Sequence, residues 1–246
     1  MLKLIMPMAG NGQRFFDAGY DLPKPLIDVK GKPMFVRVLE NIKYGTDIHV
    51  IVRKDHIEQY NIDTKIKEHC PEATVHVINE PNEGACCTVL EAVDPDSDAP
   101  FLVANCDQLM VWDKKKFYTP GGNYPGVAGG TIMTFYPNHD KPIYSYVRLD
   151  QTGRYVIQLA EKEMISNMAT TGVYHFGSQK KFVQAANHMM KMNDRTNNEF
   201  YLAPVYNYIL EPVKVYMVDE FIGMGTPEEL KATLERDLPE WKSVFV

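Results

Sequence analysis

A segment near the start of the chain combines a glycine-rich turn with two positive charges. The apolar run 2–6 predicts a buried strand that leads into the turn Ala9-Gly10-Asn11-Gly12. Backbone N–H groups of such a turn can converge on an anion. Arg14 follows with a rigid fork of donors that suits phosphate oxygens, and Lys24 lies between two prolines that stiffen its backbone. Together these residues predict a site that binds a polyphosphate.

A carboxylate after a second apolar run could hold a metal ion. Residues 101–104 predict a buried strand, and Asp107 follows shortly after it. In open α/β sheets, ligands bind beyond the carboxyl ends of the strands. A carboxylate at that place suits Mg²⁺ that bridges phosphate oxygens. Asp107 is therefore the candidate metal ligand, and its alternative role is to cap the next turn.

The glycine turn by itself is a weak match to a dinucleotide-binding loop. Phe15 stands where that motif has its third glycine, and no Gly-Lys-Ser/Thr follows as in a Walker loop. The pattern Ala-Gly-x-Gly-x-Arg followed by Pro-Lys instead resembles the nucleotidyltransferases that join a nucleoside triphosphate to a sugar phosphate, the sugar nucleotide pyrophosphorylases. The resemblance extends from Leu2 to about Leu234 and is most specific at the front.

The resemblance implies roles for the residues on the nucleotide side. Arg14 would stabilise the β- and γ-phosphates, Lys24 would neutralise the α-phosphate, and Asp107 would hold the catalytic Mg²⁺. A second loop, which opens a predicted helix at 84–93, would receive the base, with Glu83 or Asn82 reading its edge. An alternative is that this loop is a plain helix start whose acidic residues complement the helix dipole. The nucleotide-binding residues that we predict are Ala9, Gly10, Asn11, Gly12, Glu83, Gly84 and Ala85.

The resemblance is looser on the acceptor side. It implies that Lys162 reaches the phosphate of the acceptor, which completes a catalytic set with Arg14 and Lys24. Glu161-Lys162 could also be an exposed ion pair at a strand end, and Glu199 could be a helix cap. The acceptor-binding residues that we predict are Glu161, Thr171, Gly172 and Glu199.

One position departs from the pattern of the family. Relatives commonly carry a second metal-binding Asp two residues before a Gly-Thr pair, and here Gly223 stands before Gly225-Thr226. Either Asp107, phosphates and water hold the metal, or another carboxylate such as Asp219 substitutes. The departure also leaves open acceptors other than ordinary sugar 1-phosphates.

The apolar pattern predicts the elements that position these residues. Strands and helices alternate in the first half, which favours an α/β fold with a parallel-rich sheet. The resemblance implies a three-layer sandwich with a mixed, mostly parallel central sheet, Rossmann-like and similar to the GT-A fold. No linker separates two domains, so we expect one domain over 1–246, with a nucleotide-binding half (1–110) and an acceptor-binding half (111–246). The predicted strands are 2–6, 48–52, 74–78, 101–104, 127–136, 143–149, 155–160, 172–176 and 213–218, and the predicted helices are 34–42, 56–69 with a break near Asn61, 84–93, 178–192, 202–210 and one that begins at Thr226.

Composition and charge narrow the range of partners. The chain of 246 residues has a net charge of −6 and no dense basic block beyond Lys114–Lys116, which argues against nucleic acid as a partner. No apolar run is long enough to span a membrane, and we expect no signal peptide. The four cysteines lack metal-binding spacing, so we expect reduced thiols in a cytoplasmic protein. Loose precedent in the family favours a homo-oligomer.

These observations predict a Mg²⁺-dependent nucleotidyltransferase that joins a nucleoside triphosphate to a sugar phosphate or a similar small phosphorylated acceptor and releases pyrophosphate. Its product would be a precursor of surface polysaccharide. Two alternatives stay open. A GT-A-type glycosyltransferase would normally show an Asp-x-Asp pair, but Asn105 stands in place of the first Asp. A non-catalytic nucleotide-binding protein is favoured by the missing Asp at position 223. The sequence names neither the base nor the acceptor.

Overall fold

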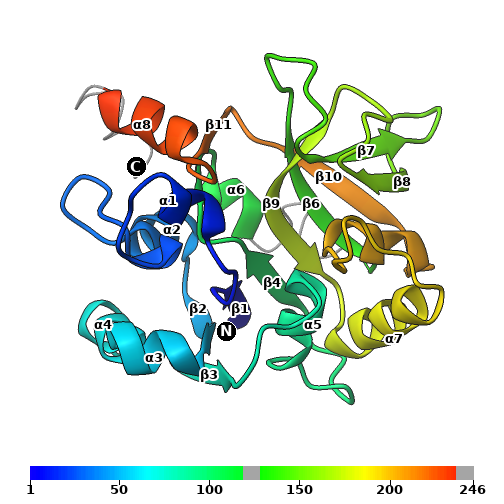
Figure 1. The fold of residues 1–246 in the computed structure, drawn as a ribbon. Coiled ribbons are helices and arrows are strands. Elements are labelled where there is room, and N and C mark those ends of the chain that lie inside the picture. Colours follow the sequence, from blue (N-terminus) through cyan, green and yellow to red (C-terminus); the bar gives the residue numbers. More distant parts are fainter. Residues whose placement is uncertain (119–127, 237–246) are drawn as a thin grey trace.

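The fold is built on a mixed, mostly parallel nine-stranded sheet (Figure 1). The computed structural model describes residues 1–118 and 128–236. The main path of the sheet has the order β10-β6-β9-β4-β1-β2-β3, with a β7–β8 hairpin attached to β9, while β5 and β11 form a separate two-stranded ribbon. In chain order the strands are β1 (Leu2–Pro7), β2 (Thr46–Arg53), β3 (Thr74–Ile78), β4 (Phe101–Ala104), β5 (Gln108–Val111), β6 (Gly130–Phe135), β7 (Ser145–Leu149), β8 (Val156–Glu161), β9 (Ala169–Phe176), β10 (Val213–Met217) and β11 (Glu220–Gly223).

The strands of the first half run parallel, because helices return the chain to the same end of the sheet between them. β1 lies between β2 and β4, so that Leu4 is in register with Ile48 and Leu102. β9 then pairs antiparallel with both β4 and β6, and β6 pairs parallel with β10. The late strands therefore extend the sheet of the first half, as the sequence predicts.

Helices cover both faces of this sheet (Figure 1). In the view of Figure 1, α2, α3 and α4 lie on one side, and α5 and α7 lie on the other. The helices are α1 (Gln13–Asp17), α2 (Met34–Ile42), α3 (Lys54–Tyr60), α4 (Ile62–His69), α5 (Ala85–Leu90), α6 (Lys114–Tyr118), α7 (Gln179–Lys191) and α8 (Pro227–Glu235), with two 3₁₀ helices, η1 (Lys24–Leu26) and η2 (Ala203–Tyr208).

The two faces of the sheet have separate cores because side chains of a strand alternate between the faces. On β1, Leu4 belongs to the core that contains Phe35 of α2, whereas Ile5 belongs to the core that contains Val89 of α5 and Phe182 of α7. Full burial of such a side chain contributes about 1.5–3 kcal/mol to folding. This packing fixes β1 and β4 at the centre of the molecule, and with them the loops that carry the predicted phosphate and metal residues.

Most predicted elements are confirmed to within a few residues. α2 spans the predicted range 34–42, and the break predicted near Asn61 is a single left-handed residue, with φ of 51°, between α3 and α4. Ser178 accepts a hydrogen bond from the backbone N–H of Lys181 and caps α7. Thr226 and Glu229 form the capping box that starts α8. No helix in the described part of the chain is long and apolar enough to cross a membrane.

Several predicted segments differ from the structure. The segment 202–210 forms a short 3₁₀ helix, and α5 ends at Leu90 instead of Val93. The strand predicted from Val127 begins at Gly130, and Val127 itself lies outside the described residues, as does the stretch 237–246 of the predicted domain. The short elements α1, α6, β5 and β11 were not predicted, because their four or five residues lack the continuous apolar run that identified β4.

Candidate active site

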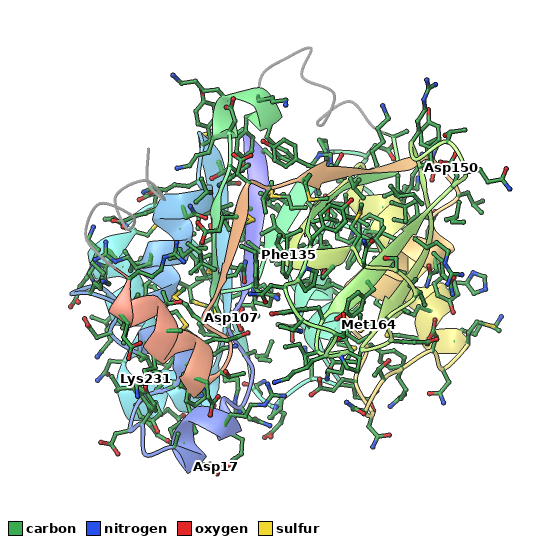
Figure 2. All side chains as sticks on the ribbon, turned by 90° about the horizontal axis from the view of Figure 1, so that it is seen from above. Asp17, Asp107, Phe135, Asp150, Met164 and Lys231 are labelled. Atoms are coloured by element: carbon green, nitrogen blue, oxygen red, sulfur yellow. The ribbon has the colours of Figure 1, made fainter. Side chains whose placement is uncertain are left out.

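A cavity of about 1000 Å³ lies beyond the carboxyl ends of β1 and β4, where the first half of the chain meets the second. Figure 2 shows Asp107 near the middle of the view, between α8, which carries Lys231, and the segment that carries Met164. Both halves of the chain contribute residues to the lining of the cavity. Of the predicted site residues, the cavity brings together Arg14, Lys24, Ala85, Asp107, Glu161, Lys162, Thr171 and Gly172.

Lys24 and Asp107 form an ion pair in this cavity. The Nζ atom of Lys24 donates to Oδ2 of Asp107 at 2.6 Å, and the two side chains are 26% and 17% exposed. Burial lowers the pKa of Lys24, but the Asp107 carboxylate outweighs burial and raises this pKa well above its ordinary value. Lys24 is therefore a permanent positive charge that is aimed into the cavity. Its position depends on η1, which begins at Lys24 directly after Pro23.

The cysteine beside this pair is not a nucleophile. Burial raises the pKa of the Cys106 thiol to about 12, so the thiol stays protonated. All four cysteines of the chain are free thiols, as predicted. The site therefore offers positioned charges rather than a reactive sulfur.

The glycine turn lies beside Lys24 and outside the lining of the cavity. Ala9, Gly10, Asn11 and Gly12 are absent from the lining residues that the structure describes. An ideal Cβ on Gly12 would lie 3.6 Å from the backbone nitrogen of Lys24, so the turn packs directly beside that lysine. The Asn11 side chain accepts a hydrogen bond from Arg53. In the structure the turn thus supports the segment that carries Lys24.

The loop predicted to receive the base is held by a distant segment. The Phe200 N–H donates to the carbonyl of Glu83 at 2.7 Å, and the Cys86 N–H donates to the carbonyl of Phe200 at 3.0 Å. Gly84 has φ of 120°, and a Cβ there would lie 2.5 Å from the Phe200 carbonyl oxygen, so only glycine fits. The Glu83 side chain is exposed outside the cavity and forms an ion pair with Arg195. Of this loop, only Ala85 lines the cavity.

On the acceptor side, Lys162 is part of a hydrogen-bonded set. Its Nζ atom donates to the Tyr201 hydroxyl at 2.7 Å and lies 4.8 Å from the centre of the Tyr201 ring. Lys162 adopts a left-handed φ of 54°, which is uncommon for a residue with a side chain. Burial and a hydrogen bond with Glu199 raise the pKa of Tyr201. Glu199 is exposed and outside the cavity lining, and it connects to the cavity through Tyr201.

Glu161 is the last residue of β8 and is half-buried, so it is not part of an exposed ion pair. It accepts a hydrogen bond from the Ser145 hydroxyl and lines the cavity. Burial raises the pKa of its carboxyl group, although the Ser145 hydroxyl and Lys162 oppose this effect. A buried carboxylate that accepts a hydroxyl hydrogen bond suits the recognition of a polar acceptor.

β9 contributes Thr171 and Gly172 to the lining of the cavity. Gly172 has φ of 82°, and a Cβ on it would lie 2.5 Å from Nδ2 of Asn105. The Asn105 N–H donates to the carbonyl of Gly172 at 3.0 Å, so β9 and the end of β4 stay close. The Thr171 hydroxyl is buried and has no hydrogen-bond partner among the described residues. It is thus available to a ligand in the cavity.

The residues around Asp107 fit a hard cation. A carboxylate oxygen is a preferred ligand of Mg²⁺. Oδ2 of Asp107 lies 3.1 Å from the position that a Cβ on Gly225 would occupy, so glycine at 225 keeps the space beside this oxygen free of a side chain. Asp219 does not share this space, because its N–H donates to the Val111 carbonyl at the far end of the β5–β11 ribbon from Asp107. A substituting role for Asp219 is therefore wrong.

Among the cavity residues that the sequence did not single out are Gln108, Tyr144, Tyr201 and Glu229. Gln108 follows Asp107 without a side chain that indicates a role by itself, Tyr144 lies in a segment with no recognisable motif, and Tyr201 follows Glu199 without matching any pattern. Glu229 was visible only as the third residue of a helix start. Its charge, close to Gly223 in the sequence, was the one signal that could have identified it.

Comparisons with known proteins identify the family and the fold of this chain. A model of the nucleotidyl transferase family matches residues 3–214. The solved structure of a nucleoside-diphosphate-sugar pyrophosphorylase from Vibrio cholerae is similar over 95% of this chain and 100% of that one, with a TM-score of 0.78 and 23% identity. At that identity the likeness is one of fold.

Two further solved structures share the fold. One is a candidate glucose-1-phosphate thymidylyltransferase from Bacillus anthracis in complex with sucrose, with 19% identity and a TM-score of 0.74 over 95% of this chain and 94% of that one. The other is the inositol-1-phosphate CTP transferase from T. maritima, with 13% identity and a TM-score of 0.72 over 99% of this chain and 95% of that one.

The family match decides among the functions considered from the sequence. It covers the glycine turn, Lys24, Asp107 and Lys162, and it favours a nucleotidyltransferase over a glycosyltransferase or a non-catalytic binding protein. The chain belongs to the nucleotidyl transferase family, and it is a nucleotidyltransferase.

Proposed function

We propose that the protein transfers a nucleotidyl group from a nucleoside triphosphate to a small phosphorylated acceptor, with a sugar phosphate as the first candidate. One observation carries this proposal. A single cavity holds Lys24 from the first half of the chain and Lys162 from the second half, so that two phosphorylated substrates can meet between two cations. In this proposal residues 1–110 bind the nucleotide and residues 111–246 bind the acceptor.

The proposed chemistry is one in-line displacement. An oxygen of the acceptor phosphate attacks the α-phosphorus, a new P–O bond forms, and the bond to the β-phosphate oxygen breaks to release pyrophosphate. Lys24 neutralises the charge on the α-phosphate, and Arg14 binds the β- and γ-phosphates. Lys162 orients the acceptor phosphate from its position beside Tyr201. Positioning and charge neutralisation supply the acceleration, with no covalent intermediate on the protein.

We propose Asp107 as a ligand of Mg²⁺ in this reaction. The support is the nature of its oxygens and the glycine at 225, which keeps a side chain away from Oδ2. A bound Mg²⁺ would neutralise phosphate charge and hold the triphosphate in a reactive geometry.

The acceptor and the biological role are also proposals. Glu161 and the unpartnered Thr171 hydroxyl in the cavity suit an acceptor that carries hydroxyl groups, as a sugar phosphate does. A nucleotide sugar is an activated donor for polymer assembly, so we include the synthesis of surface polysaccharide precursors. Nucleoside triphosphates are cytoplasmic metabolites, which makes the cytoplasm the expected place of this reaction.

A screen for pyrophosphate release tests the proposal. Each common nucleoside triphosphate is incubated with MgCl₂ and the protein, alone and with a panel of sugar 1-phosphates and other small phosphorylated acceptors. We expect release that requires one triphosphate and one acceptor together, and a nucleotide-linked product in the same reaction. If no pair releases pyrophosphate above the acceptor-free control, although calorimetry detects nucleotide binding, the proposed reaction is wrong.

A further inference from the structure

Glu229 lies in the cavity opposite Asp107. It is the third residue of α8, and its Oε2 atom accepts hydrogen bonds from the N–H groups of Gly225 at 2.9 Å and Thr226 at 3.2 Å. These bonds hold the carboxylate in one orientation. Tyr144, from the other wall of the cavity, also forms a hydrogen bond with Glu229. The carboxylate is therefore fixed in place although it lies in a wide cavity.

The Glu229 carboxylate occupies the space next to the position where relatives carry a second Asp. An ideal Cβ on Gly223 would lie 2.9 Å from Cδ of Glu229, 3.0 Å from Oε1 and 3.1 Å from Oε2. A side chain on residue 223 would therefore start inside the space that this carboxylate fills. Glycine at 223 and glutamate at 229 are geometrically linked, because the first makes room for the second.

The same carboxylate shares a small space with Asp107. A Cβ on Gly225 would lie 3.1 Å from Oδ2 of Asp107 and 3.3 Å from Oε2 of Glu229. The Met224 N–H also donates to the carbonyl of Asp107 at 2.8 Å, so β11 is bound directly to the Asp107 segment. Carboxylate oxygens from two distant parts of the chain thus both lie within 3.3 Å of one position beside Gly225.

A third oxygen in this region has no partner. Gln108 is 2% exposed and lines the cavity, and its Nε2 atom donates to the Asn105 carbonyl at 3.0 Å. That bond fixes the amide orientation and leaves Oε1 as an acceptor with no hydrogen-bond partner among the described residues. Gln108 is in register with Gly223 on the β5–β11 ribbon, so the two share one face. A buried acceptor without a donor is costly unless a ligand supplies one or a cation binds it.

Charge indicates what these oxygens bind. The Lys24–Asp107 pair is neutral by itself and has no net charge to attract a cation. Glu229 adds one negative charge to the group, and an amide oxygen adds a further hard donor.

We propose that Glu229, together with Asp107 and Oε1 of Gln108, forms a divalent-cation site in which Glu229 replaces the carboxylate absent at Gly223. This inference rests on the proposed function, because it gives the metal of that reaction its second carboxylate. It assigns to Glu229 a role that its capping box alone does not require.

The test measures binding of Mn²⁺ alone to the full chain, from the electron paramagnetic resonance signal of free Mn²⁺. The key variant is Glu229→Gln, because glutamine also closes a capping box and keeps α8 intact while it removes the charge. We expect Glu229→Gln and Asp107→Asn each to weaken Mn²⁺ binding at least about tenfold. Glu235→Gln makes the same charge change on the exposed end of α8 and should bind Mn²⁺ as the wild type does.

Thermal unfolding of Glu229→Gln serves as the folding control, and its midpoint should match that of the wild type. If Glu229→Gln binds Mn²⁺ as tightly as the wild type while Asp107→Asn does not, the inference about Glu229 is wrong and Asp107 keeps its proposed role. If the wild type binds no Mn²⁺, the proposed site is wrong, and pyrophosphate release still decides the proposed reaction. If both variants lose Mn²⁺ but no acceptor supports release, the cation site stands and the proposed reaction fails.

Discussion

At the scale of single residues, the site depends on charges that do not titrate under working conditions. Asp107 raises the pKa of Lys24, so the ammonium group is charged below that raised pKa and loses its proton only at strongly alkaline pH. Its contribution to stability follows the same sign: it is present throughout neutral pH and is lost as the pH rises through the raised pKa. Any change in activity between pH 6 and 9 therefore comes from other groups.

Replacing Lys24 should remove catalysis while the fold persists. In Lys24→Met the chain keeps a side chain of similar length but loses the cation that we propose to neutralise the α-phosphate. We expect pyrophosphate release to fall about 100- to 1000-fold, which is typical when one group that stabilises transition-state charge is removed. Lys191→Met, at an exposed position of α7, is the matched control and should retain full activity. Near-normal turnover in Lys24→Met would contradict the assigned role, provided its thermal midpoint shows that it is folded.

At the scale of elements, two segments far apart in the sequence build one wall of the site. The start of α5 and the residues before η2 exchange backbone hydrogen bonds through Phe200. Gly84 makes this approach possible, since a Cβ would lie 2.5 to 3.0 Å from three backbone atoms of Phe200. The backbone N–H and carbonyl of Phe200 are both hydrogen-bonded, so these atoms cannot move away from an added Cβ as a flexible side chain could.

Gly84→Ala should therefore destabilise the protein strongly. We expect a loss of about 3 kcal/mol or more in the free energy of unfolding, from an unfavourable φ and from overpacking against Phe200. Gly153→Ala is the comparison, because Gly153 also has a positive φ, 69°, but no atom lies within 4 Å of its Cβ position. That variant should lose only about 1–2 kcal/mol. Urea unfolding measures both free energies. If the two variants lose the same free energy of unfolding, the contact of an added Cβ at residue 84 with Phe200 costs nothing and this explanation is wrong.

At the scale of the whole molecule, β9 joins the two halves of the chain into one sheet. His175 lies in the middle of this junction, in register with Leu102 of β4 and Thr131 of β6. It is 1% exposed, and neither ring nitrogen has a hydrogen-bond partner among the described residues. Burial lowers the pKa of His175 to about 4, so the ring is neutral in the folded protein near pH 7.

This histidine should make the whole molecule sensitive to acid. Below its ordinary pKa of 6.5 the unfolded chain binds a proton that the folded protein excludes, so stability falls as the pH decreases toward 4. The loss amounts to up to about 3 kcal/mol over that range. His175→Leu should show a flatter dependence of the unfolding free energy on pH, whereas His188→Leu, at an exposed position, should not. If the unfolding free energy of His175→Leu depends on pH as steeply as that of the wild type, this explanation is wrong.

The sequence alone determined the local features that depend on neighbouring residues. The periodic pattern of 34–42 predicted α2 to the residue, and Thr226-Pro227 with Glu229 predicted the start of α8. The glycine turn with Arg14, and Lys24 between its prolines, indicated a phosphate site and the family that the comparisons support. These features are set by side-chain spacing and backbone preference within one or two turns of chain, so they can be recognised without the fold.

Only the tertiary structure decided which residues share the cavity. It placed the glycine turn beside Lys24, outside the lining, and it joined Lys162 to Glu199 through Tyr201. It also placed Glu229 in the space beside Gly223, which the sequence could mark only as a missing Asp. Such contacts depend on how strands and helices from distant parts of the chain pack at one edge of the sheet. That packing minimises exposed apolar surface over the whole molecule, and no local pattern records its result.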